Sequence, residues 1–193
     1  FGAAQTALAT PIITGASGAN STSANSVRGF EFTTTQAFTV THLSIYDQDG
    51  LGLNESHELA LWGSGQTLLA SGIIAAGTGA PLSTDSLWRL LDIVDFVIQP
   101  GTYTTGAVFL RGSLDAQFVS QTGTLAGTSW VRGRFINGSP AGSLVFPTSV
   151  ISLGLGGGGV ELAAAPAPVP APATLALFGL GLAGLGWSRR KKA

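Results

Sequence analysis

The chain has 193 residues, a formal net charge of −1 at pH 7 and no cysteine. Without cysteine it can form no disulfide, thiolate metal site or cysteine nucleophile. Four of the nine basic residues lie at 189–192, so the rest of the chain sets five arginines against all ten acidic residues. This excess of negative charge argues against nucleic acid and anionic membrane surfaces as partners.

Residues 1–9 are expected to be the remnant of an export signal. Ala7-Leu8-Ala9 has the small-x-small form of a signal-peptidase site, and the chain, which starts at Phe1, contains no methionine. Residues 10–155 are long enough for one domain with a sizeable core.

Short runs of β-branched and aromatic residues, separated by Gly, Pro, Asn and Ser, predict strands throughout residues 10–155. No stretch of ten or more residues there shows helical periodicity. Strands are expected at Val27–Thr33, Phe38–Tyr46, Glu58–Trp62, Thr67–Ile74, Leu87–Ile98 and Tyr103–Leu110, with weaker signals at Gln117–Ser120, Ser129–Phe135, Ser143–Phe146 and Ser149–Leu155. The prediction is an all-β fold: a single β-sandwich, immunoglobulin-like or jelly-roll.

Two local features of these strands can be read from the pattern. Phe38 and Val40 share one parity and Leu43 and Ile45 the other, which predicts a β-bulge near Thr41-His42. The Gly63-Ser64-Gly65 turn between two strands predicts a hairpin.

A Gly/Asp-rich loop follows the second of these strands. Its oxygen-bearing side chains and its glycines suit calcium, and the candidate ligands are Asp47, Asp49, Asn54 and Glu55. The EF-hand template does not fit, because Leu51 stands where a ligand is needed. The alternative, which we favour, is a turn that uses Asp and Gly for their conformational freedom.

The region from Val27 to Phe109 resembles a recurrent β-sandwich module of bacterial surface proteins. The likeness rests on this loop and on three short motifs: Leu61-Trp62, Leu68-Leu69-Ala70-Ser71 and Pro100-Gly101-Thr102-Tyr103. The resemblance supports the fold and implies no particular activity.

Catalytic signals are weak. No Gly-x-Ser-x-Gly elbow is present, and His57 is expected to be a solvated strand-edge residue. A glycosidase needs a pair of carboxylates, and the candidates are Glu31, Asp92 and Asp95. Their spacing in the sequence does not identify which two would form the pair. Sugar stacking is open to exposed aromatic side chains, for which the candidates are Tyr46, Trp62, Trp88 and Trp130.

After the body, residues 156–172 are expected to form a flexible Gly/Ala/Pro linker. Residues 173–193 form a tail with a C-terminal apolar helix at 175–187 and a basic end at Arg189, Arg190, Lys191 and Lys192. As a helix, Leu175 to Trp187 would cover about 20 Å, less than the ~30 Å hydrocarbon core of a bilayer. The flanking Trp and Arg/Lys side chains can extend such a span to the polar boundary.

This three-part tail resembles the PEP-CTERM sorting signal. The motif residues are Val169, Pro170, Ala171, Pro172, Ala173 and Thr174, and Ala171 stands where that family has glutamate. The resemblance implies an exosortase-type processing protease as partner and cleavage near the prolines. A sortase-type or lipid-exchange signal and a simple tail anchor are the alternatives.

The basic end follows the helix, so the positive-inside tendency predicts a C-terminus in the cytoplasm and a body outside the inner membrane. After processing, the body is expected at the cell surface or outside the cell. Exopolysaccharide is a candidate binding partner there, and nucleic acid is excluded as a partner. We expect a non-enzymatic structural or binding protein. We expect no cofactor other than the calcium ion that the Gly/Asp-rich loop suits. The alternative is an extracellular protein that binds or acts on polysaccharide.

Overall fold

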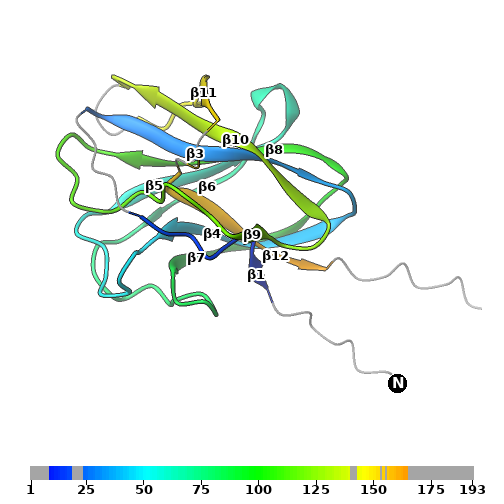
Figure 1. The fold of residues 1–193 in the computed structure, drawn as a ribbon, viewed down its shortest axis with the longest axis horizontal. Coiled ribbons are helices and arrows are strands. Elements are labelled where there is room, and N and C mark those ends of the chain that lie inside the picture. Colours follow the sequence, from blue (N-terminus) through cyan, green and yellow to red (C-terminus); the bar gives the residue numbers. More distant parts are fainter. Residues whose placement is uncertain (1–8, 19–23, 140–142, 153, 155, 165–193) are drawn as a thin grey trace, which may run out of the picture.

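A computed structural model describes residues 9–18, 24–139, 143–152, 154 and 156–164. Apart from one 3-10 turn, η1 (Ser64–Gln66), every regular element in this part of the chain is a β-strand. The strands form two main sheets that pack face to face as a sandwich (Figure 1). The predicted all-β sandwich is therefore confirmed.

The larger sheet has six strands in the order β11-β10-β3-β8-β5-β6. All of its neighbouring strands are antiparallel. Its strands are β3 (Ser26–Thr34), β5 (His57–Trp62), β6 (Leu68–Ile74), β8 (Gly101–Phe109), β10 (Thr128–Asn137) and β11 (Ser149–Ile151). The β5–β6 pair is the predicted hairpin, and its turn contains η1.

The smaller sheet has four strands in the order β1-β12-β4-β7. Its strands are β1 (Thr10–Pro11), β4 (Phe38–Tyr46), β7 (Trp88–Ile98) and β12 (Gly158–Ala164). A separate two-stranded pair joins β2 (Ile13–Thr14) to β9 (Gly123–Thr124).

The predicted bulge lies in β4. The register of β4 against β7 shifts between Val40 and His42, and a matching shift occurs on β12 between Glu161 and Leu162. A bulge of this kind lets the apolar residues on both sides of it reach the same face. Phe38, Val40, Leu43 and Ile45 accordingly all lie in one buried core.

A second, smaller apolar cluster is formed by Val27, Ala60, Trp62 and Val108. The segment 143–148 packs against it, with Phe146 edge-on to Trp62 at 5.6 Å between ring centroids. The strand predicted at Ser143–Phe146 is therefore wrong, because these side chains cover Trp62 while their backbone joins no sheet. Gln117–Ser120 likewise contributes only isolated bridges, at Phe118 and Ser120.

The boundary expected between body and linker is also corrected. The sequence predicts a linker from residue 156 onward, yet β12 lies between β1 and β4 in the smaller sheet. The glycines there permit close packing: a Cβ on Gly158 would lie 2.5 Å from the Gly106 carbonyl carbon on the opposite sheet. Thr105 Oγ1 also donates to Gly158 O at 2.9 Å, which links the two sheets. The sandwich therefore extends at least to Ala164.

The sorting motif, the expected apolar helix, the basic end and most of the expected export-signal remnant lie outside the described residues. Within the described part of the chain, no helix has both the length and the apolar character needed to cross a membrane.

Candidate functional site

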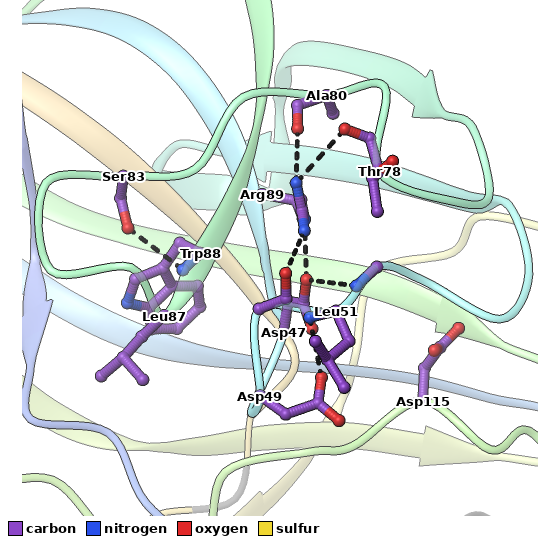
Figure 2. Close-up of polar contacts among 12 residues, drawn as sticks. Asp47, Asp49, Leu51, Thr78, Ala80, Ser83, Leu87, Trp88, Arg89 and Asp115 are labelled. Carbon is purple, nitrogen blue, oxygen red and sulfur yellow. Dashed lines mark hydrogen bonds and ion pairs between the residues drawn. The ribbon is translucent and has the colours of Figure 1, made fainter.

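The loop that joins β4 to β5 contains the predicted calcium ligands, and its first anchor is Asp47. This carboxylate is buried and accepts hydrogen bonds from Arg89 Nε at 2.7 Å and Gly52 N at 3.1 Å (Figure 2). Asp47 directly follows β4, and Arg89 lies near the start of the neighbouring strand β7. Pairing of the two strands thus brings these charges together, and the buried pair stabilises the first half of the loop.

Arg89 holds a second loop as well as the first. Its Nη2 donates to Gly50 O at 2.5 Å, and its Nη1 donates to Ala80 O at 2.9 Å. Figure 2 shows the guanidinium between the Asp47 turn and the segment that carries Thr78 and Ala80. Because a guanidinium has five donors and no acceptor, it suits this position among carboxylate and carbonyl oxygens.

Asp49 stabilises the turn locally. Its Oδ1 accepts a hydrogen bond from Leu51 N at 3.0 Å, which is the Asx-turn arrangement. Gly52 has φ of +112°, and a Cβ there would lie 2.9 Å from the Gly77 carbonyl carbon. A side chain at this position would therefore be both strained and crowded.

Asp115 closes the second half of the loop. Its Oδ1 accepts from Asn54 N at 2.7 Å and Asn54 Nδ2 at 2.9 Å, and its Oδ2 accepts from Glu55 N at 3.1 Å. His57 Nε2 lies 2.7 Å from the same Oδ2. Burial by itself would raise the pKa of Asp115, but the hydrogen bonds from His57, Asn54 and Glu55 outweigh it and lower the pKa to about 2.

His57 is fully buried, so the expectation of a solvated edge residue is wrong. Its Nδ1 lies 2.7 Å from Val108 O, and its ring packs on Phe109 at 4.8 Å between centroids. Both ring nitrogens therefore face oxygen acceptors. The histidine ties β5 to β8 and to the Asp115 loop.

The four candidate calcium ligands separate into two groups. Asp47, Asp49 and Asn54 line a small hollow of about 110 Å³ together with Asp115. Glu55 instead lies with His57 and Asp115, and the possible ligand atoms of these three are within 4.8 Å of one another. Asp47 in the first group and Asp115 in both groups already accept hydrogen bonds from protein donors, so a metal ion would have to compete with these donors.

Sequence reasoning missed Asp115 and Arg89. Asp115 lies far along the chain from the loop that it binds, and Arg89 lies inside a strand. Only the pairing of β4 with β7 and of β5 with β8 brings them to the loop. The sequence offers one signal that could have pointed to Asp115 and Arg89: they are isolated charged residues in a chain with only 10% charged residues.

The other candidate residues do not converge. Tyr46 and Trp88 are buried against Phe118, and Trp62 is 4% exposed. Trp130 stacks on Phe30 at 5.1 Å between centroids, so these four aromatic residues form no exposed sugar-stacking platform.

The candidate glycosidase carboxylates are likewise divided between the sheets. Glu31 lies on β3 of the larger sheet and is paired with Arg132 and Arg134. Asp92 and Asp95 lie exposed on β7 of the smaller sheet. Within the described residues, the hydrogen-bond and ion-pair partners of Glu31 are Arg132 and Arg134, and neither aspartate is among them.

Comparison with known protein families matches one segment, residues 168–191, to the PEP-CTERM protein-sorting motif. The chain carries a PEP-CTERM tail. The match spans Pro168, Pro170 and Pro172, the apolar run and all but the last of the four basic residues, and it identifies the tail rather than the body. No curated protein and no solved structure matches the chain. The PEP-CTERM signal indicates an exported, surface-associated protein, and motifs of this class are recognised by exosortase.

Proposed function

We propose that this protein is a non-enzymatic structural or binding β-sandwich of the cell surface or extracellular matrix, delivered by its PEP-CTERM tail. The observation that carries the proposal is the motif match at residues 168–191. The tail inserts into the inner membrane with its basic end in the cytoplasm, an exosortase-type protease cuts near Pro170 to Pro172, and the body is released outside.

The non-enzymatic role is supported by how the described charged groups are used. Asp47 and Arg89 brace the loop, and Asp115 and His57 close it. Both oxygens of Glu31 accept from guanidinium groups. Carboxylates engaged in this way serve architecture, whereas a glycosidase needs two carboxyl groups that face one another across a cleft.

The tail can be tested in the producing cell. Replacement of Arg189, Arg190, Lys191 and Lys192 by Gln removes the orientation signal, and uncleaved or mislocalised precursor should accumulate. Deletion of 174–193 should instead give body that does not associate with membranes. Arg111→Gln, which changes charge outside the tail, is the control and should leave processing unchanged.

Intact mass of protein recovered from the cell surface and the medium gives the readout. A mature form that ends near Pro172 supports the proposal. Surface protein that keeps its full tail would make the tail a simple anchor. Membrane association after the deletion would show that the tail is not the membrane-binding element.

A further inference from the structure

The outer face of the larger sheet carries a hollow of about 340 Å³, the Arg134 hollow. Its floor is formed by β3, β8 and β10, and its walls by the η1 turn and the segment 143–148. Three of its lining residues matter most for chemistry: Glu31, Arg134 and Phe146. The site is distinct from the β4–β5 loop.

The ion-pair cluster at the edge of this hollow carries a surplus positive charge: Glu31 and Arg134 line the hollow, and Arg132, which lies outside the lining, also binds Glu31. Arg132 and Arg134 both bind Glu31, so two guanidinium groups meet a single carboxylate. Burial raises the pKa of Glu31, but the hydrogen bonds and charges of Arg134 and Arg132 outweigh it and keep that pKa below its usual value. The carboxylate therefore stays ionised near neutral pH, and one positive charge is left over.

Arg134 is held in place yet keeps donor capacity. Its Nε and Nη2 donate to Glu31 Oε2, and its guanidinium lies 5.6 Å from the centre of the Phe146 ring. Its Nη1 makes only a long contact of 3.4 Å with Thr148 O. These three contacts use three of the five guanidinium N–H donors, which leaves two for an anionic ligand.

The rest of the lining offers neutral polar groups. The hydroxyl and amide side chains are those of Ser64, Gln66, Thr102, Thr104 and Thr148. A second hollow of about 510 Å³ shares Gly63, Ser64 and Thr102 with the first and includes Phe96 and Tyr103. A chain of similar units could therefore extend from one hollow into the next.

We propose that the Arg134 hollow binds acidic saccharide, with a uronate carboxylate on Arg134 and sugar hydroxyls on the Thr, Ser and Gln side chains. The surplus positive charge selects the carboxylate, and the hydroxyl-rich lining matches a polyhydroxylated ring. The inference rests on the proposed function, because it assigns the exported body a ligand outside the cell.

Isothermal titration of the full-length protein in detergent tests the assignment, with hexagalacturonate as probe and maltohexaose as neutral probe of equal length. Hexagalacturonate should bind, and more weakly as salt increases. Maltohexaose should bind at least about tenfold more weakly, and Arg134→Gln should weaken hexagalacturonate by about tenfold or more. Arg111→Gln, beyond the opposite end of β8, is the charge-matched control and should bind as the wild type does.

Thr102→Trp adds a large side chain to the lining of the hollow while Glu31, Arg132 and Arg134 keep their identities, and it should abolish binding. It decides the question if Arg134→Gln fails to fold. Equal affinity for both probes, no heat from hexagalacturonate, or full binding by Thr102→Trp would each overturn the assignment. Correct surface delivery combined with any of these results would refute the saccharide site alone, whereas failed delivery would refute the proposed function.

Discussion

Glu161 should make the fold less stable as pH rises, and Glu161→Gln should remove that dependence. Glu161 lies on β12 opposite Pro11 and His42, and it is only 3% exposed. Among the described residues, neither its Oε1 nor Oδ2 of Asp85 has a hydrogen-bond partner. Burial, together with the charge of Asp85, raises the pKa of Glu161 to about 7.

The sign and size follow from linkage. In the unfolded chain this carboxyl titrates near its ordinary value of 4.5. Between that pH and about 7 the folded state keeps a proton that the unfolded state has released, so the free energy of unfolding falls as pH rises and then levels off. At roughly 1.4 kcal/mol per pH unit, the loss is about 3 kcal/mol.

Urea unfolding of the full-length chain, followed by tryptophan fluorescence from about pH 4 to about pH 8.5, measures this. Gln resembles the protonated acid and cannot ionise, so the variant should match the wild type at low pH and exceed its stability by up to about 3 kcal/mol above pH 7. Glu58→Gln makes the same chemical change on a different strand and serves as control. Parallel pH profiles for wild type and Glu161→Gln would refute the argument.

Three further results are expected. Asp115→Asn should lower the free energy of unfolding by about 3 kcal/mol in urea, because it removes the buried carboxylate that pairs with His57 and binds the Asn54 and Glu55 amides. An unchanged midpoint would contradict this role of Asp115. Gly158→Ala should cost about 2 kcal/mol or more through its clash with β8, whereas Gly79→Ala, with no atom near the new Cβ, should be close to neutral. Titration with millimolar Ca²⁺ should give no binding heat, since protein donors already occupy the loop carboxylates; heat that disappears in Asp49→Asn would instead establish a metal site.

The sequence by itself determined the all-β class, the bulge in β4, the β5–β6 hairpin and the sorting tail. Each of these is a local pattern. Phe38–Tyr46 changes parity at its own centre, Gly63-Ser64-Gly65 lies between two short apolar runs, and the tail is an uninterrupted order of prolines, apolar residues and cations. Such signals need no partner from elsewhere in the chain.

Only the tertiary structure decided the roles of β12, Asp115 and Glu161. The glycines at 156–159 are typical of a flexible linker, but in the fold they let β12 approach β8, where a Cβ on Gly158 would clash. Asp115 meets His57 because β5 pairs with β8, and Glu161 comes within range of the Asp85 charge because β12 inserts beside β4. Composition cannot distinguish a glycine needed for flexibility from one needed for close packing, nor a solvated charge from a buried one, because that difference lies in long-range pairing.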